Sequence, residues 1–315
     1  MMSRKACELH KPIFERLGYK LEIRQVGNIK IGLWRMKFVH HRVRVRHSRR
    51  LVWMAGFGDT PLSWQVVLRG LNRALKQQFD ELVVLDLPGF NGYMGIEQCG
   101  SMDELTAGVI QVLDELEPRV VFGHSLGGWL TALYAAEKGS QKRIPGKYPG
   151  PDMVIIANPS GVFGNKRLKR QWIKRFEAAM AVGFTKFRKH IFANEPIWFP
   201  LIAWQFDHFF TRKDVLAFMK SVREDHVVES RLKHFHCKTW LLWGEADTLS
   251  PSVWVSYWLK ALKDSKLPAQ GFVIPKVGHS IHLESPVQTI SLLSSILRQQ
   301  EPTALSRRWW KEVTV

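Results

Sequence analysis

A serine, an aspartate and a histidine occur in that order in the chain, and each closely follows an apolar stretch. Ser125 lies in the pattern Gly-His-Ser-Leu-Gly, between an apolar and a helical stretch, while Asp247 and His279 follow two later apolar stretches. A serine hydroxyl is a weak nucleophile until a histidine accepts its proton and a carboxylate orients that histidine. The flanking glycines give room for a strained strand-to-helix turn from which the hydroxyl can project. The three side chains could therefore perform nucleophilic catalysis together.

The apolar stretches have the length of buried strands, and helical stretches separate them. The strand candidates are 51–55, 82–85, 120–122, 153–157, 239–243 and 272–274, and helix candidates include 63–79, 102–116 and 126–138. Strands that alternate with helices predict an α/β fold with a mostly parallel central sheet flanked by helices. In such a sheet, ligands bind at the edge formed by the carboxyl ends of the strands. We therefore expect Ser125, Asp247 and His279 at that edge.

Other local patterns predict where further elements begin. The pairs Ser250-Pro251 and Ser285-Pro286 predict helix starts, because serine caps a helix and proline suits its first position. Alternation of apolar and polar residues at 21–23 and at 43–45 predicts antiparallel strands near the N-terminus, each with one face toward water.

The serine motif and four other blocks resemble the α/β-hydrolase family. The four blocks are Ala-Gly-Phe-Gly-Asp at 55–59, Asp-Leu-Pro-Gly-Phe at 86–90, Trp-Gly-Glu-Ala-Asp at 243–247 and Gly-His-Ser-Ile-His-Leu-Glu-Ser-Pro at 278–286. The resemblance runs from about Leu51 to Arg298 and implies the α/β-hydrolase fold with a helical cap.

The resemblance also implies the roles of the site residues. Ser125 would be the nucleophile, His279 the general base and acid, and Asp247 the residue that orients the histidine. The backbone N–H groups of Phe57 and Leu126 would form the oxyanion hole. The family usually has histidine at position 55, where this chain has alanine; because the donor at Phe57 is a backbone group, we expect the hole to survive.

Several other residues compete for roles in the site. His282 is less suited as the base than His279, because it falls in the turn before the helix predicted near 286. His124 is expected to pack or hydrogen-bond below the sheet. Asn158 occupies a place where some family members carry the acid, but an amide cannot stabilise an imidazolium as a carboxylate does. The histidines and cysteine at 234–237 lack a fourth ligand, so no metal site is expected there.

The alternation of strands and helices stops between 161 and 235. We therefore expect residues 1–160 and 236–315 to form the two parts of the core and 161–235 to form a helical cap, or lid. Caps of this kind set the substrate class. An aromatic-rich run in the cap is either its inner face or the wall of an acyl-chain pocket; the pocket candidates are Trp198, Phe199, Trp204 and Phe206.

The residues around the motifs narrow the reaction that the resemblance implies. Dehalogenases and epoxide hydrolases of the family use aspartate where this chain has Ser125. Carbon–carbon hydrolases typically have tryptophan where this chain has Ser280, and haloperoxidase-like members often have methionine where it has Leu126. The expected reaction is hydrolysis of a small-molecule or lipid carboxylic ester through an acyl-enzyme, with no metal and no organic cofactor. The alternatives are a thioesterase, a carbon–carbon bond hydrolase of the same fold, and a non-catalytic basic protein that binds lipid or nucleic acid.

The charge of the chain is concentrated in two segments. The 315 residues include 46 Lys and Arg and 28 Asp and Glu, for a net charge of +18. Residues 1–50 carry 14 basic and 3 acidic side chains, residues 161–235 carry 15 and 7, and the remainder is nearly neutral. The triad and the lack of an RNA-binding signature argue against nucleic acid as a partner. An anionic membrane surface is the partner that a basic, aromatic-rich cap would suit, and the oligomeric state is left open.

Length and cysteine content bound the class of protein. The length and the 45% hydrophobic content suit one large globular domain, or a core with an insertion, and argue against disorder. Three scattered cysteines fit neither a disulfide framework nor a zinc pattern, and no signal peptide or run of about 18 apolar residues occurs. We therefore expect a cytoplasmic protein, or one peripheral to a membrane.

Overall fold

The computed structural model describes most of the chain. The described residues are 10–38, 49–88, 100–142, 144–145, 147–162, 167, 170, 174, 184–201, 203, 209, 212–263, 268–298 and 309–315.

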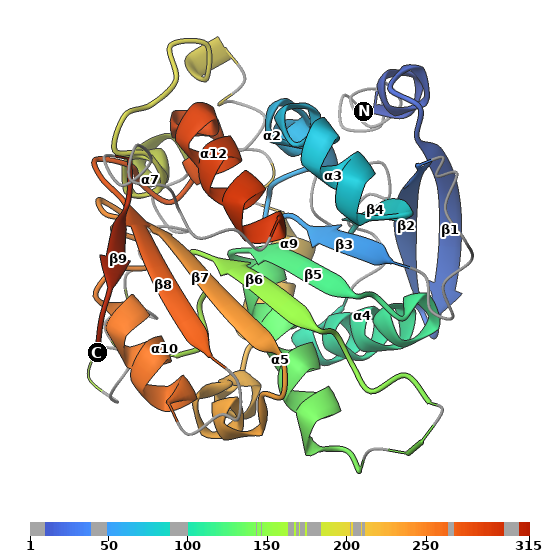
Figure 1. The fold of residues 1–315 in the computed structure, drawn as a ribbon. Helices are drawn as coiled ribbons and strands as arrows, with labels where there is room; N and C mark the ends of the chain where they lie inside the picture. The colour runs from blue at the N-terminus through green and yellow to red at the C-terminus, as the bar shows by residue number, and fades with distance from the viewer. Residues whose placement is uncertain are drawn as a thin grey trace.

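A nine-stranded sheet runs through the centre of the molecule in the order β1-β2-β4-β3-β5-β6-β7-β8-β9 (Figure 1). Its strands are β1 (Lys20–Val26), β2 (Ile29–Lys37), β3 (Arg50–Met54), β4 (Glu81–Asp86), β5 (Val120–His124), β6 (Met153–Ala157), β7 (Lys238–Gly244), β8 (Ala269–Ile274) and β9 (Lys311–Val313). The six strands from β3 to β8 are parallel to one another. The strands β1, β2 and β9 pair antiparallel at the two ends of the sheet.

Helices cover both faces of this sheet (Figure 1). The helices α2 (Gln65–Gly70), α3 (Asn72–Gln78) and α12 (Pro286–Leu297) lie on one face, and α4 (Met102–Leu116), α5 (Leu126–Ser140) and α10 (Trp254–Leu262) lie on the other. Other helices in the described part of the chain include α7 (Phe184–Ile191), α9 (Lys213–Lys220) and α11 (Ile281–Glu284), with short 3-10 turns η1 (Pro61–Trp64), η2 (Glu224–His226) and η3 (Glu229–His234). No described helix is long and apolar enough to cross a bilayer.

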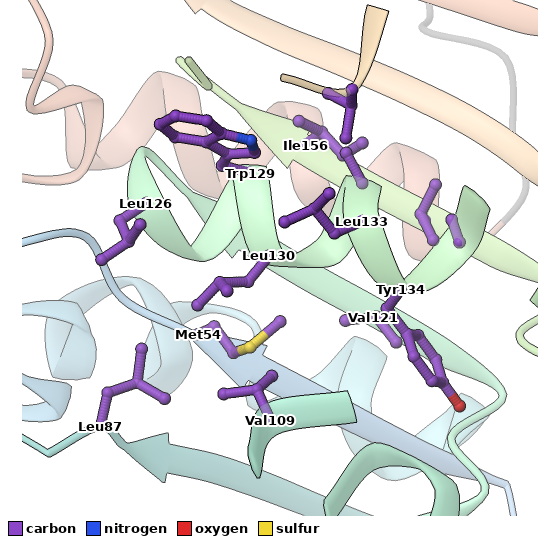
Figure 2. Packing of buried hydrophobic residues seen from close by; sticks show 14 of the residues in the cluster. Met54, Leu87, Val109, Val121, Leu126, Trp129, Leu130, Leu133, Tyr134 and Ile156 are labelled. Atoms are coloured by element: carbon purple, nitrogen blue, oxygen red, sulfur yellow. The ribbon is translucent and has the colours of Figure 1, made fainter. Parts of the chain in front are cut away.

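Alternate residues of the parallel strands fill two apolar clusters, one on each face. In β3, Val52 and Met54 join the cluster under α4, α5 and α10, while Leu51 and Trp53 join the cluster under α2, α3 and α12. This two-sided burial explains why the strands read as short continuous apolar runs in the sequence. Figure 2 shows the first cluster, where Leu130 on α5 lies near Met54. The dense packing below α5 fixes the helix that follows the motif serine.

The α/β-hydrolase fold predicted from the sequence is confirmed, with local corrections. The helix predicted at 63–79 is divided into η1, α2 and α3. The start predicted at Pro251 is wrong, because α10 begins at Trp254, whereas α12 does begin at Pro286. The strand predicted around 21–23 is β1, and the one at 43–45 lies outside the described residues. The described part of 161–235 contains α7, α9, η2 and η3 and no strand; its assignment as a cap stays a prediction.

Candidate active site

Ser125 lies at the tight turn between β5 and α5. Its backbone has φ 53° and ψ −115°, a conformation that side-chain-bearing residues rarely adopt. The backbone N–H of Ser125 donates to the carbonyl oxygen of Ala157 at 2.8 Å, which holds the turn against β6. A Cβ on Gly127 would lie only 2.5 Å from the carbonyl oxygen of Ala55, and one on Gly123 would collide with the carbonyl of Gly127. The glycines of the motif are therefore required by close backbone contacts.

Asp247 and His279 meet at the carboxyl edge of the sheet, after β7 and β8. Their Oδ2 and Nδ1 atoms are 2.8 Å apart, and both side chains are buried. The other carboxylate oxygen, Oδ1, accepts the backbone N–H groups of Leu249 and Ser250, each at 2.8 Å. The segment after β7 thus folds around the carboxylate and fixes the oxygen that faces His279.

Asn158 follows β6 and also binds the carboxylate. Its Nδ2 donates to Oδ2 of Asp247 at 2.7 Å, and its backbone N–H donates to the carbonyl of Leu242 at 2.9 Å. The sequence indicated that Asn158 cannot replace the acid, but its role as a donor to Asp247 was missed. Oδ2 therefore receives one donor from the amide and one from the imidazole.

The backbone around His279 is tied to neighbouring segments. Its N–H donates to the carbonyl of Ile191, at the end of α7, at 2.7 Å. The Glu284 carboxylate accepts from the N–H groups of Gly278 at 3.1 Å and of Ala193 and Asn194 at 2.9 Å. Burial raises the pKa of Glu284, an effect that these backbone donors oppose. The residues after α7 are thereby anchored to the histidine segment.

Ser125 and His279 line the same pocket, whose empty space, including its open mouth, is about 640 Å³. Its wall is largely apolar and includes Phe57, Phe187, Ile191, Phe192, Phe199, Leu249 and Leu283. Of the predicted pocket residues, Phe199 is buried and lines the pocket, whereas Trp198 is 48% exposed and is not part of the lining. Trp204 and Phe206 lie outside the described residues. Phe57 belongs to the wall and Leu126 is buried at the start of α5, but their role as an oxyanion hole stays a prediction.

The site also contains residues that the sequence did not single out as a group. Asp59, in the segment after β3, lies beside His124 and His282, and its ligand-type atoms lie within 4.8 Å of theirs. The oxygen Oδ2 of Asp59 accepts from the indole N–H of Trp64 at 3.0 Å. No local sequence pattern joins these residues, because they come from three separate segments: the one after β3, the end of β5 and α11.

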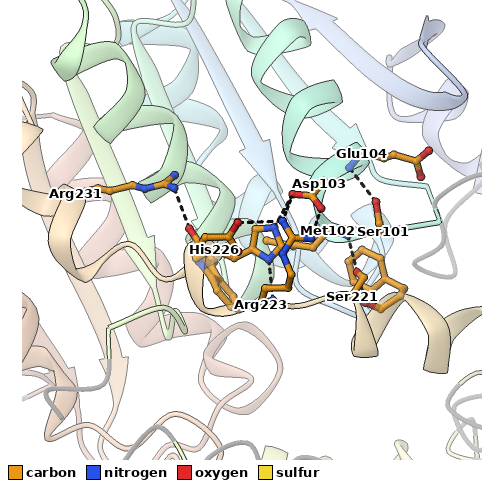
Figure 3. A network of polar contacts seen from close by, with 11 residues as sticks. Ser101, Met102, Asp103, Glu104, Ser221, Arg223, His226 and Arg231 are labelled. Carbon is orange, nitrogen blue, oxygen red and sulfur yellow. Dashed lines mark hydrogen bonds and ion pairs between the residues drawn. The ribbon is translucent and has the colours of Figure 1, made fainter. Parts of the chain in front are cut away.

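A polar network joins the predicted cap to the core (Figure 3). The two carboxylate oxygens of Asp103, at the start of α4, contact Nη1 of Arg223 at 2.6 Å and Nε2 of His226 at 2.9 Å. These partners hold the pKa of Asp103 at about 2. The backbone N–H of Met102 donates to Oγ of Ser221 at 2.8 Å. The residues that follow α9 are therefore fixed to the helix below them.

The fold and the serine turn define an α/β hydrolase, and the chain belongs to the alpha/beta hydrolase family, whose model matches residues 51–292. Among relatives, it is 27% identical over 258 residues to a 2-succinyl-6-hydroxy-2,4-cyclohexadiene-1-carboxylate synthase of Escherichia coli O7:K1, covering 79% of this chain and 93% of the relative.

Among solved structures, a putative lipase from Acinetobacter baumannii AYE superimposes with a TM-score of 0.67 at 18% identity, covering 92% of this chain and 95% of the other. An esterase from Exiguobacterium antarcticum superimposes with a TM-score of 0.64 at 16% identity, covering 88% and 98%. A membrane phospholipase A superimposes with a TM-score of 0.63 at 19% identity, covering 95% and 92%. At these identities the likeness concerns the fold.

Proposed function

We propose that the protein is a serine hydrolase that cleaves a carboxylic ester through an acyl-enzyme. The proposal is carried by one observation: a serine on a strained strand-to-helix turn lines the same pocket as a histidine whose Nδ1 atom contacts a buried carboxylate. In this proposal Ser125 is the nucleophile, His279 the general base and acid, and Asp247 the orienting acid.

The hydrogen bonds around Asp247 determine which proton transfers are available. With Nδ1 of His279 donating to Asp247, Nε2 is the nitrogen left to accept the proton of the Ser125 hydroxyl. The serine oxygen then attacks the ester carbonyl, and the N–H groups of Phe57 and Leu126 stabilise the oxyanion. His279 returns the proton to the leaving alcohol, and the same residues activate water to hydrolyse the acyl-enzyme.

The lining of the pocket supports an ester with an apolar acyl group. Phenylalanine, isoleucine and leucine side chains line the pocket together with Ser125, so an alkyl chain would bury its surface there at about 25 cal/mol per Å². Carbonyl chemistry of another kind is the second candidate, because the E. coli relative is named a synthase. Appreciable turnover of simple esters distinguishes the first candidate from the second.

A fluorophosphonate probe and a series of p-nitrophenyl esters test the proposal directly. The wild-type protein should be labelled at Ser125 and should hydrolyse the esters, while Ser125→Ala should lose both properties. The matched control is Ser140→Ala, at the far end of the same helix, where the hydroxyl only donates to the carbonyl of Glu137. Equal esterase rates in wild type and Ser125→Ala, or labelling elsewhere, would refute the assignment.

We further propose that residues 161–235 bring the pocket to an anionic membrane surface. Ile197 is 98% exposed and Leu201 is 77% exposed. Each lies two residues along the chain from Phe199, which lines the pocket. Exposed basic side chains in the same region include Arg167, Arg170 and Lys174. Sedimentation with phosphatidylglycerol vesicles at low salt should exceed that with phosphatidylcholine vesicles, and Ile197→Ser/Leu201→Ser should weaken it. Equal sedimentation with both vesicles would exclude this role.

A further inference from the structure

A second acid–histidine pair lies near the proposed triad, with His282 buried and the Asp59 side chain 17% exposed. Asp59 belongs to the segment after β3, and His282 lies on α11, three residues after His279. The Nε2 atom of His282 is 3.3 Å from Oδ2 of Asp59. The His282 ring stacks on Trp64, with 4.0 Å between centroids and 13° between planes. Because the same indole donates to Oδ2 at 3.0 Å, one tryptophan fixes both members of the pair.

The surroundings of Asp59 keep its carboxylate charged. Burial alone would raise its pKa, but His282 and, more weakly, His124 outweigh this and hold the pKa at about 2. Its Oδ1 accepts the N–H of Thr60 at 2.8 Å, and its Oδ2 faces the indole and His282. Asp59 lines the pocket that contains Ser125. A carboxylate free to turn toward Ser125 would destabilise an oxyanion formed there. We therefore expect the donors that hold Asp59 in place to favour the transition state.

His124 connects this pair to the segment of the proposed base. Its Nε2 lies 2.9 Å from the backbone carbonyl oxygen of His279, and its ring centroid is 5.3 Å from that of His282. Burial, together with His279 and His282, lowers the pKa of His124 well below its ordinary value. A neutral imidazole that donates through Nε2 to this carbonyl satisfies the contact. The residue before the nucleophile is thus bonded to the residue proposed as base.

A bound metal ion is the competing explanation for a cluster of one carboxylate and two histidines. Oδ2 of Asp59, the oxygen nearest His282, already accepts the indole N–H and is in direct contact with the imidazole. This arrangement gives the carboxylate its partners without an ion. Within the described residues, both ring nitrogens of His282 and Nδ1 of His124 lack a hydrogen-bond partner, so the metal content of the protein is measured beside the activity of the variants below.

We propose that Asp59 and His282 act as a pair of positioning residues for the proposed ester hydrolysis. Asp59 is two residues after Phe57, whose N–H is the proposed oxyanion donor, and His282 follows the proposed base by three. The contact between them joins these two segments, and His124 contacts the backbone carbonyl of His279. If the proposed oxyanion donor at Phe57 or the proposed base is misplaced, stabilisation of the transition state falls more than substrate binding does. Loss of the pair should therefore lower kcat while leaving KM nearly unchanged.

The test combines Asp59→Asn with His282→Phe, which keeps a ring to stack on Trp64. For each single variant we expect kcat for p-nitrophenyl butyrate and the rate of fluorophosphonate labelling to fall about tenfold, equivalent to about 1.4 kcal/mol, with KM within twofold. Because the two residues act through one contact, kcat of the double variant should be no lower than kcat of the less active single variant. Asp80→Asn is the matched control. Asp80 lies just before β4, its carboxylate accepts from the backbone N–H and the guanidinium of Arg49, and it is not part of the pocket lining.

Several outcomes would overturn the inference. These are an Asp59→Asn variant as active as Asp80→Asn, a change in KM alone, or losses that simply add in the double variant. A stoichiometric divalent metal whose removal by chelator abolishes activity would replace the network with a metal site. Failure of the proposed function is distinct from all of these, because it appears as residual activity in Ser125→Ala. If Asp59→Asn does not fold, His282→Phe is compared with Asp80→Asn in the same assays, and equal kcat values for these two variants overturn the inference.

Discussion

Replacing Asn158 by aspartate would put a second carboxylate against Asp247. The amide Nδ2 now donates to Oδ2 of Asp247 at 2.7 Å, in a buried site. Two unit charges at this distance repel by about 6 kcal/mol at an effective dielectric of 20. The pair would therefore take up one proton and share it rather than remain doubly ionised.

The cost of that proton sets the size of the expected effect. An unfolded aspartate has a pKa of about 3.9, and each pH unit above it costs about 1.36 kcal/mol to keep the group protonated. The cost is therefore capped at about 1.5 kcal/mol at pH 5 and at about 5.6 kcal/mol at pH 8. The pKa of the shared carboxyl is raised in the folded state, so the relative stability of the variant falls as pH rises. We expect Asn158→Asp to lose about 2–4 kcal/mol more stability at pH 8 than at pH 5.

Urea unfolding at pH 5 and pH 8 measures this difference. Asn158→Ala is the control, because it loses the hydrogen bond to a charged group, worth about 1.5–3 kcal/mol, without adding a charge. Its destabilisation should be similar at both pH values. The reasoning is refuted if Asn158→Asp is equally destabilised at pH 5 and pH 8, or if both variants show the same pH dependence.

Three further predictions test other parts of the structure. Gly127→Ala would place a Cβ 2.5 Å from a backbone carbonyl oxygen, so it should cost about 1–3 kcal/mol in urea unfolding and slow fluorophosphonate labelling; wild-type stability and labelling would contradict the packing argument. Burial opposes ionisation of Glu81, but Arg35 and Arg50 outweigh this effect and lower the pKa of Glu81. The ionised carboxylate therefore stabilises the fold at pH 7, and this stabilisation is lost as pH falls. In thermal unfolding, Glu81→Gln should be more destabilising at pH 7 than at pH 3, and an equal loss at both pH values would contradict this reasoning. Burial raises the pKa of Cys237 to about 12, so peptide mapping should find it alkylated by iodoacetamide at pH 8 only after unfolding, and rapid native alkylation would contradict its burial.

The sheet and the serine turn could be predicted from the sequence because their signals are local. Strands buried on both faces read as short apolar runs, and the run at 51–55 corresponds to β3 within one residue at each end. The serine turn requires glycine at 123 and 127 for backbone contacts, which leaves a recognisable motif.

The errors arose where a tertiary contact replaced a local preference. Ser250 has the sequence context of a helix cap, but its N–H donates to Asp247 and its carbonyl accepts the indole N–H of Trp243 at 2.6 Å. The residues after β7 are therefore used to enclose a carboxylate, and the helix begins later. The interruption of the predicted helix at 63–79 falls beside Gly70, where any Cβ would collide with the side chain of Ile290 on α12. Neither contact has a signature near it in the sequence.

The distribution of charge around the pocket bears on the substrate as much as its shape does. Asp59 lines the pocket with Ser125, Asp247 contacts His279, and the described lining of the pocket contains no lysine or arginine. Among the described residues that line the pocket, none of the basic side chains behind the net charge of +18 provides a counter-ion for the proposed nucleophile. An acyl group that ends in a carboxylate would lose its hydration in an apolar pocket without gaining a cationic partner. Among substrates with the same leaving group, p-nitrophenyl butyrate should accordingly have a kcat/KM at least about tenfold above that of p-nitrophenyl hemisuccinate, a gap of about 1.4 kcal/mol. Equal values for the two esters would mean that a cation reaches the pocket when substrate binds, and would direct attention to the basic residues between 161 and 235.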